Sequence, residues 1–375
     1  MTRLVRAPGR GLTAGLAALV LTAACAGSAS PTRAPTSGPT ATAAALATAA
    51  PTARPAPTGT PAPTPTVAPT IGEPADDGAR IIAVDANPPL IRCTDTGCSD
   101  PVVVPGRRAR DLTVDSPAVG TVKVRLLLPA HFDAQPATRW SVLYLFQGGD
   151  LPYTGWTEWN AVEAMTAKMD LLVVMPAIGD GSYTDWWNGG NGGPPMWETF
   201  HLVELRQLLE RNWQAGDRRA VAGVSLGGFG AMEYATRRPD LFRYAASYSG
   251  GLNQQLGGQN QWGSSLLWGD PVAQADVWKA HDPTTNAAAL RGMGLFVSYG
   301  NGKPGPLDNG KPSVWDPSGD IERLCEAASK VFLARLAELK IPVTVDAYGN
   351  GTHSVPYADR ELQRSLPLIL KALGE

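Results

Sequence analysis

The stretch VAGVSLGGFGAMEYATRRPDLF, from Val221 to Phe242, places one serine among glycines directly after an apolar run. Its centre, GVSLG (223–227), has the form G-x-S-x-G. The apolar run before it predicts a strand, and the residues after it predict a helix. A chain that turns this sharply from strand to helix needs glycine on both sides and exposes the serine hydroxyl at the carboxyl edge of a sheet. We therefore interpret Ser225 as a nucleophile rather than as part of an ordinary glycine-rich turn.

A serine hydroxyl is a weak nucleophile without a base, so the turn predicts a histidine and an acid later in the chain. The chain has four histidines. His131 and His201 precede Ser225, whereas proteins with this turn have the order Ser, acid, His. His281 lies before the next predicted strand, and we interpret it as a surface or structural residue. His353, in YGNGTHSVPY, follows the last predicted strand and is the expected base.

The acid is less clearly marked. Asp308, Asp316, Asp320 and Glu322 all follow the apolar run LFVSY (295–299). A loop aspartate shortly after that strand is the simplest expectation, which favours Asp308. Glu322 opens a predicted helix, where a carboxylate could simply complement the helix dipole. Spacing alone leaves the acid open.

Short apolar runs alternate with helical patterns, which predicts an α/β fold with a mostly parallel central sheet and helices on both faces. Asp111–Val114 and Val122–Leu128 are expected to pair as an antiparallel edge. Apolar residues at three-to-four spacing predict helices over Glu198–Trp213 and Asp320–Lys340. The later strands are expected at VLYLF (142–146), LLVVMP (171–176), AVAGV (220–224), YAASYS (244–249), LFVSY (295–299) and VTVDAY (343–348).

The N-terminal fifth of the chain lies outside this pattern. Arginines followed by the apolar run Gly11–Ala24 predict an export signal over residues 1–25, too short for a comfortable membrane span. Its end, LTAAC (21–25), resembles a bacterial lipobox with its usual Leu displaced by one position, so Cys25 is expected to be lipidated. Plain secretion is the alternative. Both place the protein outside the cytoplasm, either free or on the outer face of the membrane.

Residues 26–76 are dominated by Pro, Thr, Ala and Gly, and we expect a disordered linker there, acting as a spacer. Residues 77–106 are expected to form an N-terminal extension in which Cys93 and Cys98 are close enough to form a disulfide. Cys325 is left over and should pack on a helix as a small apolar side chain. Residues 107–375 fit one large α/β domain.

The composition excludes some partners. A formal net charge of −2 leaves no basic surface for nucleic acid. Outside the signal, no second Cys or His pair stands at zinc-ligand spacing, so we expect no metal. Serine chemistry of this kind also implies no organic cofactor.

Taken together, the segments from about Arg107 to Leu373 resemble the secreted mycolyltransferases of the antigen 85 group and the wider esterase D-like branch of the α/β-hydrolases. Such a domain is expected to have the α/β-hydrolase fold. The similar segments are SPAVG (116–120), LYLFQGG (143–149), GW (155–156), VVMP (173–176), YTDWW (183–187), MWETF (196–200), GVSLGG (223–228), WKAHDP (278–283), YGNGKP (299–304) and NGTHSVPY (350–357).

The resemblance implies roles for individual residues. Ser225 matches the family's nucleophile and His353 its base. The family's acid is a Glu ten residues before a helix Phe, and Glu322 precedes Phe332 by that spacing, which moves the expected acid to Glu322 with Asp308 as the alternative. Backbone N–H groups of Leu226 and Gly149 are the expected oxyanion donors.

Two departures from the family concern the acceptor. An Arg of the oxyanion loop that helps to bind trehalose is missing, and Asp150 stands near its place. A Trp after the His-Ser pair is replaced by Val355. The chain is therefore expected to be an exported serine esterase or acyltransferase that uses an acyl ester and either water or a sugar hydroxyl. The alternatives are a true mycolyltransferase and a catalytically silent wall-binding relative.

Overall fold

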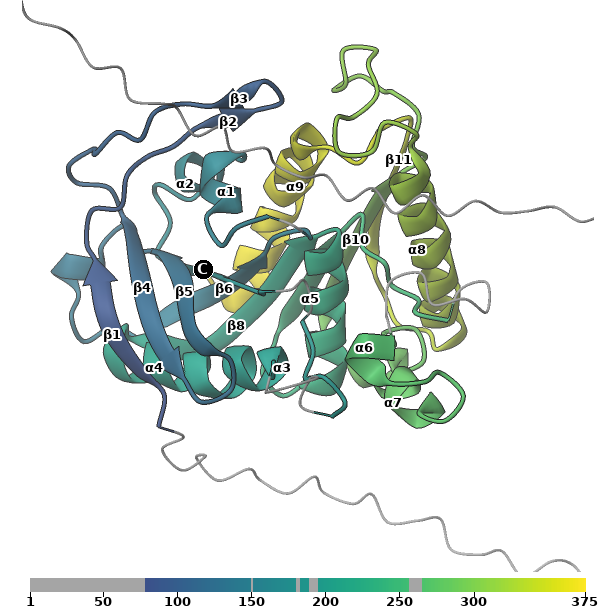
Figure 1. The fold of residues 1–375 in the computed structure, drawn as a ribbon, viewed down its shortest axis with the longest axis horizontal. Coiled ribbons are helices and arrows are strands. Elements are labelled where there is room, and N and C mark those ends of the chain that lie inside the picture. Colours follow the sequence, from purple (N-terminus) through teal and green to yellow (C-terminus); the bar gives the residue numbers. More distant parts are fainter. Residues whose placement is uncertain (1–77, 150, 180–182, 189–194, 256–264) are drawn as a thin grey trace, which may run out of the picture. The chain divides into compact units, whose positions relative to one another are not determined.

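The computed structural model describes residues 78–149, 151–179, 183–188, 195–255 and 265–375 (Figure 1). The predicted export signal with Cys25, the predicted linker over 26–76 and Asp150 lie outside the described residues. Within the described part of the chain, no helix combines the length and apolar character needed to cross a bilayer.

Nine strands of the described chain form one sheet in the order β1-β4-β5-β7-β6-β8-β9-β10-β11 (Figure 1). The neighbours from β7 through β6 to β11 are parallel, whereas β1, β4, β5 and β7 pair antiparallel in turn. The strands are β1 (Arg80–Asp85), β4 (Ala109–Ser116), β5 (Gly120–Leu127), β6 (Trp140–Phe146), β7 (Leu171–Pro176), β8 (Ala215–Val224), β9 (Tyr244–Tyr248), β10 (Gly294–Gly300) and β11 (Thr344–Gly349).

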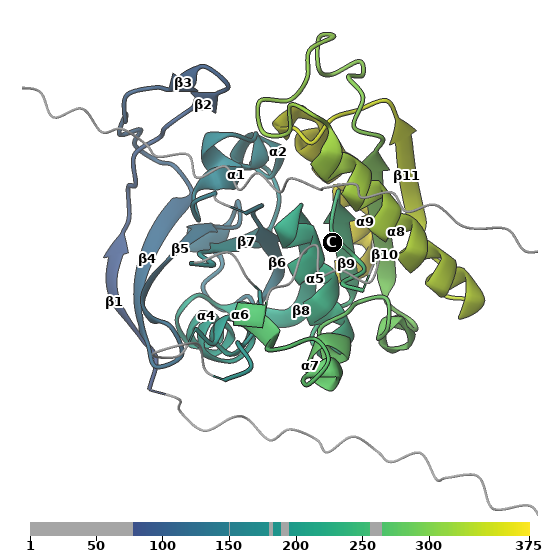
Figure 2. The same ribbon diagram turned by 45° about the vertical axis from the view of Figure 1, so that its right-hand side comes forward.

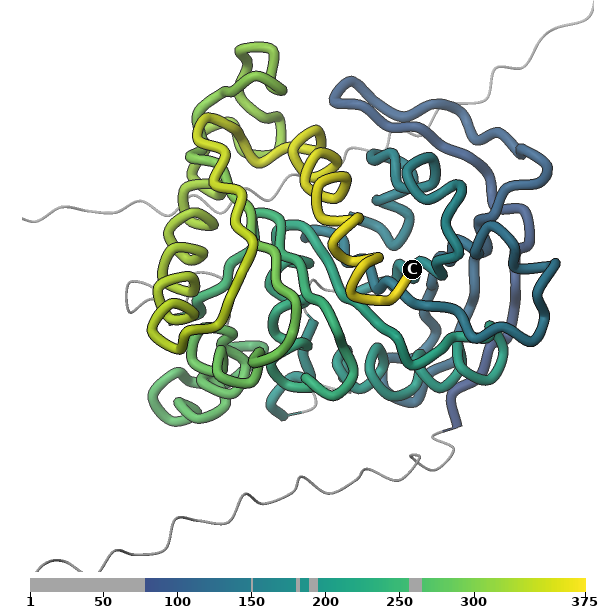
Figure 3. Tube along the Cα trace, turned by 180° about the vertical axis from the view of Figure 1, so that it is seen from behind, coloured from purple at the N-terminus to yellow at the C-terminus, as the bar shows by residue number. Residues whose placement is uncertain are grey.

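Helices cover both faces of the sheet, as Figures 2 and 3 show from two further sides. One face carries α4 (Arg206–Asn212), α5 (Leu226–Arg237) and α8 (Asp320–Glu338), and the other carries α1 (Gly155–Glu158), α2 (Val162–Met165) and α9 (Val355–Leu373). The remaining helical segments are η1 (Phe132–Ala134), α3 (Trp197–Thr199), η2 (Phe200–Leu205), α6 (Ser265–Trp268), α7 (Ala275–Ala280) and η4 (Ala287–Leu290).

The central strands are apolar at successive positions because both of their faces are covered. Every residue of β6 and β7 is buried. Along β6, Val142 and Tyr144 belong to the core under α4, α5 and α8, whereas Leu143 and Leu145 belong to the core under α1 and α9. This alternation is the two-residue period of a strand.

The antiparallel part of the sheet differs from the prediction in one respect. β4 and β5 pair antiparallel as expected, but the edge of the sheet is β1, which lies in the segment 77–106 that we expected to form an N-terminal extension. Most side chains of β1 are exposed, so backbone pairing attaches it without an alternating pattern that sequence analysis could detect. The same segment forms the small hairpin β2 (Cys93–Thr94) and β3 (Gly97–Cys98), joined by a Cys93–Cys98 disulfide.

The carboxyl ends of the parallel strands lie at one edge of the sheet, and the chain leaves each of them with a polar or glycine segment. Gly148 follows β6, Ser225 follows β8 and Ser249 follows β9. The loop after β10 leads to Glu322 at the start of α8, and the loop after β11 carries His353 into α9. In open α/β sheets this edge is where ligands bind.

Candidate active site

Ser225 lies in the turn between β8 and α5, in a strained conformation. Its φ of 58° and ψ of −123° are unusual for a residue with a side chain. The backbone N–H of Ser225 donates to Tyr248 O at 2.8 Å, which ties the turn to the end of β9. Strain of this kind persists only where the surroundings fix it, and it is common at reactive residues.

The glycines beside Ser225 are required by close backbone approach. A Cβ at Gly223 would lie 2.3 Å from Gly227 O, and a Cβ at Gly227 would lie 2.4 Å from Phe146 O. A Cβ at Gly228 would lie 2.6 Å from Ser247 Oγ. The glycines therefore allow α5 to start directly against the ends of β6 and β8, which answers why this serine is surrounded by glycine.

Two sets of backbone N–H groups flank Ser225. Leu226 is the first residue of α5, so its N–H has no acceptor one turn earlier in the helix. Gly148 and Gly149 approach from the loop after β6: a Cβ at Gly148 would lie 3.9 Å from Ser225 Oγ, and a Cβ at Gly149 would lie 3.8 Å from Leu226 Cδ2. The positive end of the α5 dipole also points to this position and would stabilise a negative charge that forms there.

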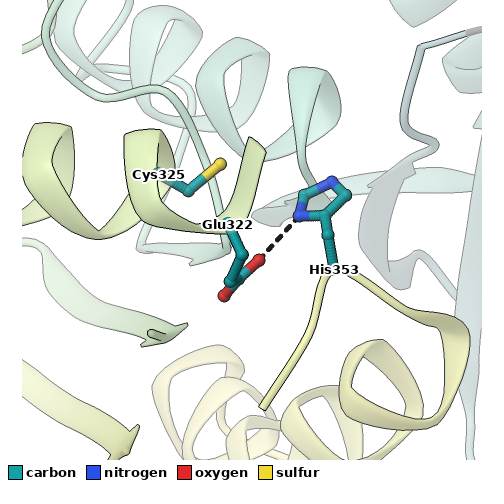
Figure 4. Close-up of side chains that lie close together, drawn as sticks. All are labelled: Glu322, Cys325 and His353. Atoms are coloured by element: carbon teal, nitrogen blue, oxygen red, sulfur yellow. Dashed lines mark hydrogen bonds and ion pairs between the residues drawn. The ribbon is translucent and has the colours of Figure 1, made fainter. Parts of the chain in front are cut away.

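His353 and Glu322 are joined across two elements (Figure 4). Figure 4 shows Glu322 in the first turn of α8 and His353 on the loop that leads into α9. The imidazole Nδ1 of His353 lies 2.7 Å from Glu322 Oε2. Because Nδ1 is bound to the carboxylate, Nε2 is the nitrogen left for another partner.

Glu322 is fully buried and is surrounded by donors. Its Oε1 accepts from the Gly300 N–H at 2.6 Å, from Ser249 Oγ at 2.7 Å and from the Tyr348 hydroxyl at 3.1 Å. Burial tends to raise the pKa of Glu322, but the hydrogen bond and charge of His353 together with the Gly300 N–H outweigh it and lower the pKa. The carboxylate is therefore held in its charged form beside the imidazole.

Asp308, the alternative acid, contacts the loop of His353 without contacting its ring. Its carboxylate accepts from the hydroxyls of Thr352 and Ser354, on either side of His353, and from the Gly305 N–H at 2.7 Å. Asp308 therefore holds the loop that carries the imidazole. The structure places Glu322, not Asp308, against His353.

A cavity of about 440 Å³ opens beside these groups. Ser225, His353, Gly148 and Gly149 line it. Much of the remaining wall is apolar, from Leu151, Val224, Leu226, Trp315, Ile321 and Val355. An apolar cavity with a few convergent polar groups is the usual form of a small-molecule site.

The other histidines lie elsewhere. His281 is buried against Glu233 and Thr184, and burial lowers its pKa to about 4. His201 is buried between the Tyr234 hydroxyl and a backbone carbonyl, and burial likewise lowers its pKa to about 4. His131 is exposed beside Asp170.

Two groups in the described part of the chain bring three potential metal ligands within 4.8 Å of one another. In the first, Cys325 lies near Glu322 and His353 on the buried side of α8 (Figure 4), and burial raises the pKa of its thiol, which disfavours the thiolate that a metal needs. The second consists of Glu198, Glu233 and His281.

The guanidinium of Arg237 already pairs with one carboxylate of the second group. Arg237 Nε binds both carboxylate oxygens of Glu198, at 2.7 and 2.9 Å. A metal ion there would face the positive charge of Arg237. We assign neither group as a metal site.

Sequence analysis missed the residues that support the candidate acid. Ser249 and Tyr348 were not singled out, and Asp316 was named only as a candidate acid, whereas its Oδ2 accepts from the Glu322 N–H at 3.0 Å and so caps α8. Ser249 has a φ of 49° and directly follows β9, as the last residue of the predicted strand YAASYS (244–249). Its position at a carboxyl strand end was the one signal that could have identified it.

The sequence has relatives among known proteins. Residues 118–354 match the model of a protein family described as putative esterase. The diacylglycerol acyltransferase/mycolyltransferase Ag85B of Mycolicibacterium smegmatis is 30% identical over 293 residues, which are 72% of this chain and 87% of that protein. The esterase Rv1288 of Mycobacterium tuberculosis is 29% identical over 252 residues, 62% of this chain and 51% of the relative, so the chain spans about half of its length.

Solved structures share the fold. MPT51 of Mycobacterium tuberculosis has a TM-score of 0.53 at 23% identity, covering 69% of this chain and 96% of that chain. The fluorophosphonate-binding serine hydrolase FphF of Staphylococcus aureus has a TM-score of 0.55 at 17% identity, covering 70% of this chain and 98% of that chain. These similarities show an α/β-hydrolase fold, with a mostly parallel sheet and helices on both faces, as the sequence predicted.

Proposed function

We propose that the chain, which belongs to the putative esterase family, is an ester hydrolase or acyltransferase, namely an exported serine esterase acting through Ser225, His353 and Glu322. The observation that carries the proposal is the hydrogen bond of 2.7 Å between Glu322 Oε2 and His353 Nδ1, beside the cavity that Ser225 also lines. The strained turn at Ser225 supports it.

In the proposed reaction, Ser225 Oγ attacks the ester carbonyl carbon and His353 Nε2 takes the hydroxyl proton. Glu322 orients the ring and stabilises the imidazolium that forms. The N–H groups of Leu226 and Gly149 hold the negative oxygen of the tetrahedral intermediate. His353 then gives its proton to the leaving alcohol, and the acyl group remains bonded to Ser225.

The second half of the reaction repeats these steps with another nucleophile. Water or a sugar hydroxyl loses its proton to His353 and attacks the acyl-enzyme, which releases a carboxylic acid or a new ester. Transfer to a sugar is the second candidate function. It is suggested by the relative from Mycolicibacterium smegmatis, which is named a mycolyltransferase and matches this chain over 87% of its own length. A silent wall-binding role is disfavoured, since such a protein has no need to bring a serine, a histidine and a buried carboxylate to one cavity.

The proposed location follows from the N-terminal sequence. The export signal over 1–25 and the Pro- and Thr-rich segment after it support a domain held outside the cytoplasm, tethered through lipidated Cys25. Such an enzyme would act on esters of the cell envelope.

Labelling tests the nucleophile directly. The folded protein is incubated with a fluorophosphonate, and the modified peptide is identified by mass spectrometry. We expect one adduct, on Ser225, and none in Ser225→Ala. An adduct at another residue, or none on folded wild-type protein, would contradict the proposal.

A further inference from the structure

A tryptophan that the proposed reaction does not use lines the same cavity as Ser225 and His353. Trp315 belongs to the loop between β10 and α8, and 39% of it is exposed. The Trp159 ring packs against it at a centroid distance of 4.9 Å and an interplanar angle of 78°. Trp159 directly follows α1, so the pair joins two segments that lie far apart in the sequence.

A short chain of hydrogen bonds fixes Trp315 beside His353. The backbone N–H of Trp315 donates to Ser313 Oγ at 3.1 Å, and the Ser313 hydroxyl donates to the backbone carbonyl of His353 at 2.7 Å. These bonds tie the backbone of Trp315 to the backbone of His353, and the Trp159 ring packs against the indole itself. This anchoring distinguishes it from a surface tryptophan that happens to be exposed.

Trp315 also bears on one of the departures noted in the sequence. Val355, which stands where the resembling transferases have a Trp, lines the cavity as an aliphatic side chain. Compared with those transferases at the same sequence position, this chain lacks the flat aromatic surface next to the histidine. Trp315 brings an indole to the same cavity from a different loop.

We propose that Trp315, braced by Trp159, determines specificity by binding a ring with a flat apolar face. The ring is either a pyranose of the alcohol half of the ester or an arene of the acyl half. Both present a planar or nearly planar C–H or π face that packs on an indole, whereas a linear chain gains only apolar contact. The proposal rests on the proposed esterase function.

Three small esters separate the sources of the ring. Butyl butyrate has none, methyl phenylacetate has an arene in its acyl half, and methyl 6-O-butyryl-glucoside has a pyranose in its alcohol half. For Trp315→Ala we expect kcat/KM to fall roughly tenfold on at least one ring-bearing ester, mainly through KM, and to stay within about twofold on butyl butyrate.

Matched variants identify what is lost. Trp315→Phe keeps a ring and should retain most of the preference, whereas Trp315→Leu keeps apolar bulk and should behave as Trp315→Ala. Trp187→Ala is the control, because 45% of Trp187 is exposed and its N–H binds Leu267 O away from the cavity lining. Trp187→Ala should leave the ratio of kcat/KM between the ring-bearing esters and butyl butyrate unchanged.

An equal fall on all three esters, or no fall on either ring-bearing one, would overturn the proposal. Ligand binding measured on the inactive Ser225→Ala protein, with and without Trp315→Ala, separates failure of the ring-binding proposal from failure of the proposed esterase function. If wild type hydrolyses none of the esters, calorimetry with methyl phenylacetate and methyl glucoside still measures ring binding. Weaker binding after Trp315→Ala then supports the proposal, and equal binding or no binding overturns it.

Discussion

Glu322→Gln removes one charge from the proposed triad while keeping its shape. The three donors to Oε1 determine how the amide would lie. The hydroxyls of Ser249 and Tyr348 can rotate to accept a hydrogen bond, but the Gly300 N–H, at 2.6 Å, can only donate. The amide oxygen must therefore stay with Gly300, and the NH₂ group must face His353.

An NH₂ group facing His353 Nδ1 stabilises the wrong tautomer. Nδ1 becomes the acceptor and the proton moves to Nε2, so the nitrogen proposed to take the Ser225 proton can no longer do so. Triad acids replaced by their amides lose roughly 10⁴ in kcat, and we expect a loss of about 10³–10⁴ here. At 1.36 kcal/mol per tenfold, the barrier rises by about 4–5.5 kcal/mol.

Asp308→Asn is the matched control, since it makes the same chemical change in a carboxylate that holds the loop of His353. Its amide oxygen can accept from the Gly305 N–H, while its NH₂ donates to the hydroxyls of Thr352 and Ser354, which can rotate. We expect kcat to fall less than about tenfold. Both variants are assayed with p-nitrophenyl butyrate at saturation, after thermal unfolding has shown that they are folded.

The reverse ranking would refute this reasoning and make Asp308 the acid. A loss of less than about tenfold for Glu322→Gln would show that His353 does not depend on this carboxylate for its tautomer.

Three further outcomes are expected. Cys25→Ser should release the protein into the medium while wild type partitions into detergent; wild-type protein in the medium that starts at another residue would mean plain secretion. Glu361 is buried in α9, and burial and then the charge of Asp346 raise its pKa to about 7, so the folded state binds its proton more tightly and stability falls as pH rises from about 4.5 to about 7. Glu361→Gln should therefore gain about 1–2 kcal/mol at pH 8 relative to pH 4 in urea unfolding, and an equal effect at both pH values would contradict this. Because Asp150 stands near the place of the transferases' Arg, hydrolysis of p-nitrophenyl butyrate should exceed transfer to millimolar trehalose, and acyl-trehalose as the main product would contradict that expectation.

The central parallel strands could be predicted from the sequence because strands buried on both faces are apolar along their whole length. VLYLF and LLVVMP lie within β6 and β7 at nearly the expected bounds. β1 could not, since its residues are mostly exposed and only backbone pairing to β4 attaches them.

The same distinction applies to the site. Ser225 and His353 could be singled out because one lies in a turn that needs glycines and the other follows the last predicted strand. From spacing alone, Asp308 appeared the simpler acid, and only the resemblance favoured Glu322. The physical reason is that the loop after β10 is long and returns to the cavity at the start of α8, where Asp316 caps the helix that presents Glu322. The number of residues after a strand therefore does not tell which carboxylate of a long loop comes back to the cavity.

The cavity wall depends on tertiary structure even more strongly. A comparison of aligned positions records Val355 as the loss of an aromatic surface. The structure brings Trp315 into the cavity from the loop before α8 and ties it through Ser313 to the backbone of His353. Ring recognition can therefore persist although the residue next to the histidine has changed. If so, the preference of this chain for a ring-bearing ester should depend on Trp315, and not on the identity of position 355 alone.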